Sequence, residues 1–194
     1  MRPVHENPCL PAPRAEPPLP YRHPGRHLHL PAALPQAVSA AFAEAAGARR
    51  EAGALLYGVR GIGVGDADVV HALVIPAQIG HRTHYRIPPE SIAAASAATR
   101  PLGLVTVGQV HSHPGEDVEH SWYDDRHAVS TRAVSFVLPR YGRDPRDWLA
   151  RIGVHDYQDD WWHQLTAEQT ITRVSLTGAP LKILDLRTSD GSSR

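Results

Sequence analysis

The sequence predicts an α/β (α+β) domain in which a single mixed β-sheet is flanked by helices. Short apolar runs of strand length alternate with segments of helical spacing, and turn residues separate them. The hydrophobic fraction of 42% and the charged fraction of 21% are those of ordinary globular proteins. A chain of 194 residues is long enough for one domain with a proper core.

The first part of the predicted domain contains a strand, a helix and a β-hairpin. Polar and apolar residues alternate over His27–Leu30 as in a strand, and apolar residues recur at helical spacing over 35–46 before Gly47, a plausible helix stop. Two apolar runs, at 54–59 and 69–75, are separated by glycines and an aspartate. We therefore predict a hairpin in this part of the sheet.

The second part alternates helices and strands. An alanine-rich helix is expected over 89–99, and the β-branched strand at 104–110 leads directly into His111. After it we expect, in chain order, a helix at 122–131, strands at 133–138 and 148–157, and a further strand at 161–165. Strands interleaved with helices favour one mixed sheet.

A proline-rich segment precedes the predicted domain. Residues 1–26 contain many prolines and few large apolar groups, so they cannot bury enough surface to offset their ordering entropy. We predict a disordered or extended arm there that does not dock. The domain is then expected to span residues 27–188, followed by a polar tail at 189–194.

Composition and charge exclude several classes of partner and location. The formal net charge is zero, so no overall basic field draws the protein to nucleic acid or to an anionic membrane. No apolar run reaches the length of a transmembrane helix, and residues 1–6 lack the apolar stretch of a secretory signal. The single Cys9 excludes an internal disulfide framework and a cysteine zinc cluster. We therefore predict a cytoplasmic protein with no nucleic-acid or membrane partner.

The segment from His111 to Asp124 has the spacing of a metal site. Residues two positions apart in a strand face the same side, so His111 and His113 can both approach one metal ion. Pro114 then ends the strand, and Ser121 stands where a helix could begin, which would place Asp124 in its first turn. Two histidines, one carboxylate and a water form an open zinc site of the catalytic type.

Single parts of this motif carry little information, because the chain contains 13 histidines. About one His-x-His pair is expected by chance, and the pair at 27–29 is a second one with no acidic or proline partner at the same offsets. Ser121-x-x-Asp124 alone is a helix-capping signal. Only the combination of histidines, proline, serine and aspartate at fixed offsets indicates a metal site.

Hydrolysis at a metal site also needs a base that accepts a proton from water. Glu51 is the candidate, because it opens the first long strand, 51–58, whereas most apolar strands in this chain lack an acid. The alternative is a solvated glutamate at the edge of the sheet, and position alone leaves both open. His84 and Tyr85, between a strand and a helix, are weaker candidates for contacts with substrate.

The combined pattern resembles the JAMM/MPN+ (JAB domain) zinc metalloprotease family. The matching features are a glutamate, a glycine and a leucine-rich run, followed further along by His-x-His-Pro, Ser and Asp at the family's spacing. The order of elements from about His27 to Leu176 is also similar to that fold. The resemblance is closest to compact bacterial members, which accompany ubiquitin-like conjugation systems.

The resemblance implies a JAMM/MPN-like fold whose layering is similar to that of cytidine deaminases. It also implies one Zn²⁺ per chain, bound by His111, His113 and Asp124. In this interpretation Glu51 is the general base and Ser121 donates a hydrogen bond to the oxyanion.

The function implied by the resemblance is that of a deubiquitinase-like zinc isopeptidase. It would remove or process a ubiquitin-like modifier by hydrolysis after its C-terminal glycine. The expected partners are the ubiquitin-like protein or its conjugate, and the activating and conjugating enzymes of the same system. Two alternatives stay open: a hydrolase that releases an amino acid from a ubiquitin-fold sulfur-carrier protein, and a zinc-stabilised interaction module without activity.

Overall fold

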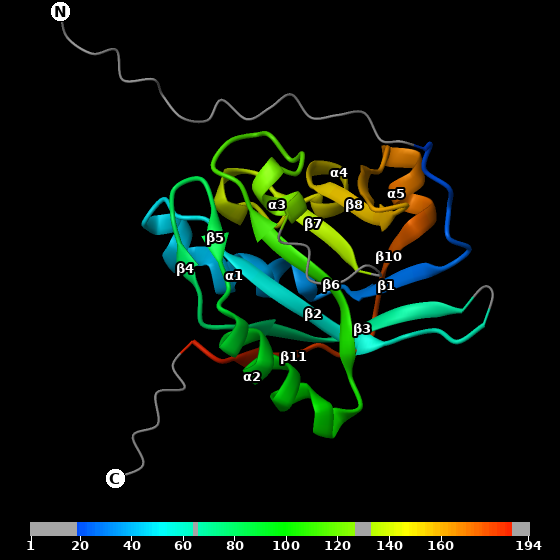
Figure 1. Ribbon diagram of the computed structural model, residues 1–194, viewed down its shortest axis with the longest axis horizontal. Helices are drawn as coiled ribbons and strands as arrows, with labels where there is room; N and C mark the ends of the chain where they lie inside the picture. The colour runs from blue at the N-terminus through cyan, green and yellow to red at the C-terminus, as the bar shows by residue number, and fades with distance from the viewer. Residues whose placement is uncertain (1–18, 64–65, 127–132, 188–194) are drawn as a thin grey trace, which may run out of the picture.

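A computed structural model describes residues 19–63, 66–126 and 133–187, and a mixed β-sheet forms the centre of this part of the chain (Figure 1). Eight described strands follow the order β10-β1-β3-β2-β6-β7-β8-β9, and a ninth, β11, pairs with β3. Their bounds are β1 (His27–Pro31), β2 (Gly53–Val59), β3 (Ala67–Ile75), β6 (Val105–Ser112), β7 (Val134–Leu138), β8 (Gly153–Gln158), β9 (Trp161–Gln164), β10 (Val174–Thr177) and β11 (Lys182–Asp185).

Helices and a small hairpin complete the described fold. The hairpin strands β4 (Ile79–Gly80) and β5 (Tyr85–Arg86) form a separate two-stranded sheet. The helices are α1 (Leu34–Gly47), α2 (Pro89–Thr99), α3 (Trp122–Arg126), α4 (Trp148–Arg151) and α5 (Ala167–Arg173), with 3₁₀ turns at Arg100–Leu102 and Arg140–Gly142. The α/β (α+β) class with a single mixed sheet flanked by helices is confirmed. In the described ranges, no helix combines the length and apolar character needed to cross a membrane.

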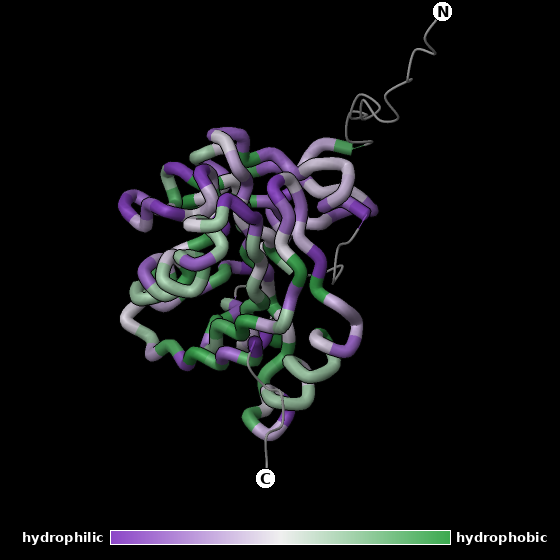
Figure 2. The backbone as a smooth tube through the Cα atoms, turned by 90° about the vertical axis from the view of Figure 1, so that its left-hand side faces the viewer, coloured by the Kyte–Doolittle hydropathy of each residue, from purple (hydrophilic) through white to green (hydrophobic). Residues whose placement is uncertain are grey.

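Both faces of the central strands are covered. Because neighbouring side chains of a strand point to opposite faces, Leu56 packs in the core cluster that includes Phe42 of α1, while Leu55 packs in the cluster that includes Ala95 of α2. Strand β2 is therefore apolar at nearly every position instead of alternating. Figure 2 shows hydrophobic residues along the inner strands and hydrophilic residues over much of the outer loops.

The register between β2 and β6 determines what lies at one end of the sheet. The two strands are antiparallel, and Gly53 is paired with His111. The start of β2 therefore lies beside the end of β6. Strand β7 runs parallel to β6 on its other side, with Val137 paired with His111. Residues just before β2 and at the end of β6 consequently meet at the same edge of the sheet.

Most predicted elements agree with the structure, and the differences have local causes. The strand predicted at 148–157 is wrong in its first half, because residues 148–151 form α4 and β8 begins only at Gly153. Asp147, which precedes α4, has a φ of 49°, a value outside the range of strand residues, and the Trp148 ring that follows it packs on Phe136. The helix predicted at 122–131 begins as expected, but positions 127–131 lie outside the described residues.

Several elements were missed from the sequence. The short strands of the β4–β5 hairpin and of β10 and β11 have only two to four residues each, so they give no usable periodicity. Helix α5 did offer a signal. Thr166 accepts a hydrogen bond from the Gln169 backbone amide while the Gln169 side chain accepts one from the Thr166 amide, which is a capping box readable from sequence.

The prediction that residues 1–26 form an undocked arm requires correction in its described part. Residues 1–18, like the predicted tail at 189–194, lie outside the described residues. Tyr21 packs against the main core, and its hydroxyl donates a hydrogen bond of 3.0 Å to Asp156. Asp156 also accepts a hydrogen bond from the buried Arg173. The Gln158 side chain also accepts a hydrogen bond from the Arg22 amide and donates one to the Arg22 carbonyl, so this described part of the segment is docked on the domain.

These contacts predict that Tyr21 stabilises the fold. Tyr21→Ala should lower the free energy of unfolding by about 2–3 kcal/mol through lost ring burial, and Tyr21→Phe by about 1 kcal/mol through the lost hydrogen bond. Urea unfolding followed by circular dichroism measures both. Leu19→Ala, in the same segment but 45% exposed, is the matched control and should change little. An unchanged midpoint for Tyr21→Ala would show that the segment is not docked.

Candidate metal centre

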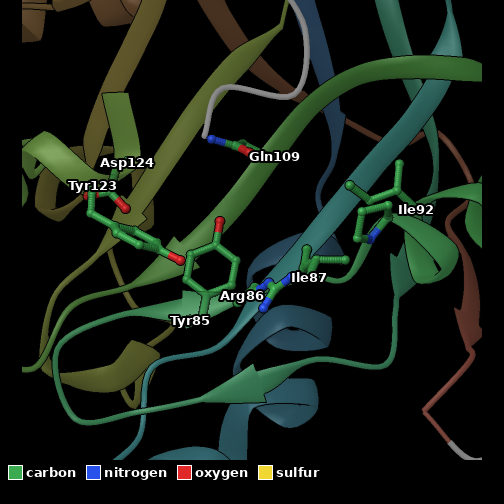
Figure 3. Close-up of a pocket in the computed structure, with 8 residues that line it drawn as sticks. Tyr85, Arg86, Ile87, Ile92, Gln109, Tyr123 and Asp124 are labelled. Atoms are coloured by element: carbon green, nitrogen blue, oxygen red, sulfur yellow. The ribbon is translucent and has the colours of Figure 1, made fainter. Parts of the chain in front are cut away.

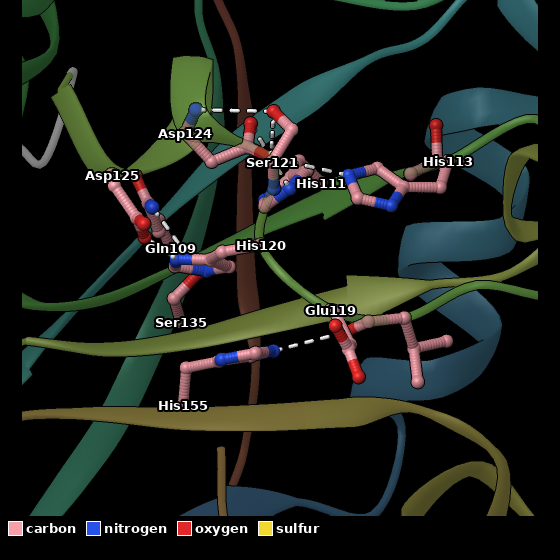
Figure 4. Close-up of polar contacts among 12 residues, drawn as sticks. Gln109, His111, His113, Glu119, His120, Ser121, Asp124, Asp125, Ser135 and His155 are labelled. Atoms are coloured by element: carbon pink, nitrogen blue, oxygen red, sulfur yellow. Dashed lines mark hydrogen bonds and ion pairs between the residues drawn. The ribbon is translucent and has the colours of Figure 1, made fainter. Parts of the chain in front are cut away.

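The structure brings His111, His113 and Asp124 together at the end of β6. His113 Nε2 lies 3.3 Å from Asp124 Oδ2, and His111 Nε2 lies 3.5 Å from Asp124 Oδ1. One potential ligand atom from each residue lies within 4.8 Å of the other two, and all three residues are buried. Figure 4 shows the two imidazoles and the carboxylate facing one another.

Local structure explains how each side chain reaches this position. His111 lies in β6, and His113 follows it with its main chain tied to the next elements: its amide donates to the Leu138 carbonyl at 2.8 Å, and its carbonyl accepts from the Tyr141 amide at 2.7 Å. These two bonds keep the chain extended as far as His113. The two histidines therefore point to the same side, as the alternation of a strand predicts.

The carboxylate of Asp124 is positioned by Ser121. The Ser121 amide and hydroxyl each donate a hydrogen bond of 2.7 Å to Asp124 Oδ2, and Ser121 Oγ accepts one from the Asp124 amide at 3.3 Å. Ser121 thus precedes α3 in the role expected of a helix N-cap, and Asp124 lies in the first turn. The predicted Ser-x-x-Asp geometry aims the carboxylate at the histidines.

The three residues fit a divalent metal ion. His111 is fully buried, and neither of its ring nitrogens makes a hydrogen bond within the described residues, which is costly unless something else binds them. The distances from Asp124 to the two histidines match the separation of about 3.4 Å between tetrahedral zinc ligands. Burial by itself would raise the pKa of Asp124, but His111, His113 and Ser121 keep that pKa well below its usual range. An anionic carboxylate between two imidazoles is a suitable donor set.

Glu51 lies at the same edge and is not a solvated glutamate. Its side chain is 3% exposed, and its amide donates to the His81 carbonyl at 2.7 Å. The next residue, Ala52, accepts a hydrogen bond of 3.0 Å from the Ser112 amide, which extends the pairing of β2 with β6. Burial raises the pKa of Glu51 to about 8, with His113 lowering it and Asp124 raising it. Of the two interpretations left open by the sequence, the buried candidate base is the one that the structure supports.

The two weaker substrate candidates differ in position. The Tyr85 ring lies over the backbone of Gly53, where a Cβ atom would be only 2.2 Å from the ring. The centre of the same ring lies 5.4 Å from the centre of the His111 ring. Tyr85 therefore packs against a candidate ligand and limits its movement. His84 is at the rim, with its ring 5.3 Å from that of Tyr123.

A group of buried polar side chains behind the centre was missed from the sequence. His120 Nε2 lies 2.8 Å from Ser135 Oγ, which also accepts a hydrogen bond of 3.2 Å from the side-chain nitrogen of Gln109 (Figure 4). His120 Nδ1 lies 3.2 Å from Asp125 Oδ1, and its ring stacks on that of His155. These contacts fix the residue preceding Ser121; from the sequence alone, His120 beside the motif could either support the candidate ligands or lie in solvent, and the structure buries it.

Gln78 was also missed, and it supports the start of β2. Its side-chain oxygen accepts a hydrogen bond of 2.7 Å from the Gly53 amide, and its nitrogen donates one of 2.8 Å to the Gly53 carbonyl. Strand β3 has already ended at Ile75, so the amide group replaces a missing strand on that side of Gly53. It thereby fixes the backbone two residues from Glu51.

Comparisons with known proteins identify similar chains. A family model described as prokaryotic homologues of the JAB domain matches residues 33–152. The probable metalloprotease y4jG of Sinorhizobium fredii (strain NBRC 101917 / NGR234) is 36% identical over 86 residues, which are 41% of this chain and 52% of that protein. This chain thus spans about half the length of the curated relative it matches.

Two solved structures are similar in fold. A solution structure of a protein from Desulfitobacterium hafniense has a TM-score of 0.57 and 19% identity, covering 79% of this chain and 94% of that one. Another, from Salinibacter ruber, has a TM-score of 0.51 and 19% identity, covering 71% and 88%. At these identities the likeness shows the fold alone.

The buried Glu51 predicts a pH dependence of stability in the metal-free protein. Because its folded pKa is raised from 4.5 to about 8, the folded state retains a proton that the unfolded chain has lost, so stability falls as pH rises across this window. His113, whose pKa is raised by Asp124 against the effect of burial, contributes in the same direction. Glu51→Gln should reduce the fall in the free energy of unfolding across this pH range by a few kcal/mol at most. Chelator-treated samples unfolded in urea across this pH range measure it, and identical slopes for wild type and variant would contradict the prediction.

Proposed function

This chain belongs to the family of prokaryotic homologues of the JAB domain, as the sequence resemblance predicted, and from this membership and the site we propose a zinc-dependent isopeptidase. Its proposed substrate is a ubiquitin-like modifier, processed or removed by hydrolysis after its C-terminal glycine. The observation that carries the proposal is a buried glutamate of raised pKa beside an open His-His-Asp centre. The family and the name of its relative indicate a metalloprotease; the isopeptidase activity, the zinc and the modifier are the proposed additions.

Each residue has a defined task in this proposal. Zinc bound by His111, His113 and Asp124 would supply Lewis-acid chemistry that activates water and polarises a carbonyl group. Glu51 accepts the proton of the attacking water and passes it to the leaving amine. Ser121 donates its hydroxyl hydrogen to the developing oxyanion, for which the hydroxyl must turn away from Asp124. The Ser121 amide bond to Asp124 keeps the carboxylate oriented while it does so.

The shape of the site supports a bond within a longer chain. One cavity of about 510 Å³ opens on the side of Asp124 and Tyr123, and another of about 330 Å³ is lined by Glu51, His113 and Ser121. Polypeptide can therefore continue in both directions from the centre. This favours an isopeptide or internal bond over the release of a single amino acid from a sulfur-carrier protein, for which one open side suffices. The activating and conjugating enzymes of the same system are the proposed further partners.

The metal assignment gives a direct prediction. The purified protein should contain about one zinc per chain, and His113→Ala should reduce this content to background, because two ligands do not retain the ion. His27→Ala, in the other His-x-His pair, is the matched control and should keep its zinc. Elemental analysis measures the content, and a zinc-dependent rise in Tm gives a readout independent of activity. Zinc retained fully in His113→Ala would contradict the assignment.

The role of Glu51 gives a second prediction. Glu51→Gln should keep zinc and fold but cleave at least about 100-fold more slowly, because an amide cannot accept the proton. Glu168→Gln, an exposed glutamate in α5, is the control and should cleave at the wild-type rate. The probe is a ubiquitin-like protein from the same genome, extended beyond its terminal glycine, and mass spectrometry locates the cleavage.

Each outcome of this experiment decides between the candidate functions. Cleavage after the final glycine, absent in Glu51→Gln, supports the isopeptidase. Activity confined to the loss of one amino acid would favour the sulfur-carrier alternative. Intact substrate in the presence of zinc-loaded wild-type protein would favour a non-catalytic interaction module.

A further inference from the structure

The larger cavity beside the metal centre has chemistry of its own. We propose that it binds a large apolar side chain, aliphatic or aromatic, from the segment of substrate that precedes the scissile bond. The inference rests on the proposed function and adds a substrate preference to it. The cavity, called the apolar pocket below, is lined by Tyr85, Arg86, Ile87, Pro89, Ile92, Gln109, Tyr123 and Asp124.

The apolar pocket has a polar end and an apolar end (Figure 3). Asp124 and Tyr123 lie at one end, next to the metal centre, with the Gln109 side chain directed towards the same space. Ile87 and Ile92 lie towards the opposite end. A bound chain would therefore meet polar groups close to the reacting bond and apolar groups further from it, which is the usual division in ligand pockets.

The apolar end has contact surface that the fold itself does not use. Ile87 packs partly against the smaller core cluster, whereas Ile92 belongs to neither core cluster and is only partly buried. Ile92 stands in the first turns of α2, whose buried residues are Ser91, Ala95 and Thr99. Its side chain therefore lines the cavity instead of the core. A volume of about 510 Å³ is sufficient for an aliphatic or aromatic side chain and the backbone that carries it.

The position of Glu51 indicates which part of the substrate enters the apolar pocket. A base that passes a proton to the leaving amine must lie on the amine side of the bond. Glu51 lines the other cavity, together with His113 and Ser121, and is not part of the apolar pocket. The amine side therefore occupies that other cavity, and the acyl segment with its terminal glycine extends into the apolar pocket.

Charge at the pocket adds a second selection. Arg86 is exposed and lines the pocket, so its guanidinium disfavours a basic side chain there through like-charge repulsion. The expected preference is thus for leucine, isoleucine, methionine or phenylalanine over lysine or arginine at one position before the scissile bond.

The test measures binding and needs no turnover. Full-length, zinc-loaded Glu51→Gln is titrated with fluorescein-labelled peptides that end in Gly-Gly, each with one leucine at a different position in an otherwise alanine segment. One leucine position should bind at least about tenfold more tightly than the all-alanine peptide, because the pocket removes the larger apolar side chain from water. Lysine at that position should bind no better than alanine.

Two substitutions of Ile92 connect the preference to the pocket. Ile92→Asp, which makes the apolar end acidic, and Ile92→Trp, which fills it, are each added to the Glu51→Gln protein. Either should bring the affinities of the leucine and alanine peptides within about twofold of each other. Ile171→Asp, at a 74% exposed isoleucine of α5, is the matched control and should leave the preference intact. Circular dichroism and zinc content verify that each variant is folded and loaded.

The outcomes separate this inference from the proposed function. Equal binding of all peptides, or a leucine preference that survives both Ile92 substitutions, would overturn the apolar pocket even if wild-type protein cleaves a modifier. A leucine preference lost in both Ile92 variants would support the pocket even if wild-type protein cleaves nothing, in which case only the proposed hydrolysis fails.

Discussion

Strands β2 and β6 are antiparallel, and their register places Gly53 opposite His111. This pairing brings the start of one strand to the end of the other, so that Glu51 and the two histidines meet although they are distant in sequence. Hydrogen bonds between Ala52 and Ser112 continue the pairing past the regular ladder. A slip of one residue would turn every side chain of the strand to the opposite face and would move Gly53 from its place opposite His111.

The Gln78 side chain forms the hydrogen bonds that the backbone of Gly53 lacks from a neighbouring strand. Antiparallel pairing with β3 ends before Gly53, and the Gln78 amide takes the place of the missing strand. Glycine is required at this position because the Tyr85 ring lies where a Cβ atom would be. One small residue therefore allows an aromatic ring to pack against His111. Backbone, amide and ring together leave the start of β2 little freedom.

Charge balance at the metal centre follows from the same arrangement. Asp124 is buried, and a buried carboxylate is stable only if hydrogen-bonded and paired. Ser121 and the two histidines meet that need. Among the residues that the structure describes, Glu51 has no comparable set of donors, and burial raises its pKa. Two carboxyl groups of one site thus have opposite tendencies, one to stay ionised and one to accept a proton, which is the division expected of a ligand and a base.

The sequence by itself predicted the cluster of two histidines and an aspartate and most of the fold. Histidines two apart in a strand, a proline, and a serine three residues before an aspartate are local patterns, and local geometry fixes what they form. The sequence did not determine that Glu51 is buried, that Tyr21 docks, which way His120 points, or that Ile92 lines a pocket. Those facts depend on which surfaces meet across the sheet, and pairing between distant strands is set by tertiary packing instead of local preference. The substrate preference proposed for the apolar pocket is therefore a property of the tertiary structure, whereas the residues of the His-His-Asp cluster could be named from the chain alone.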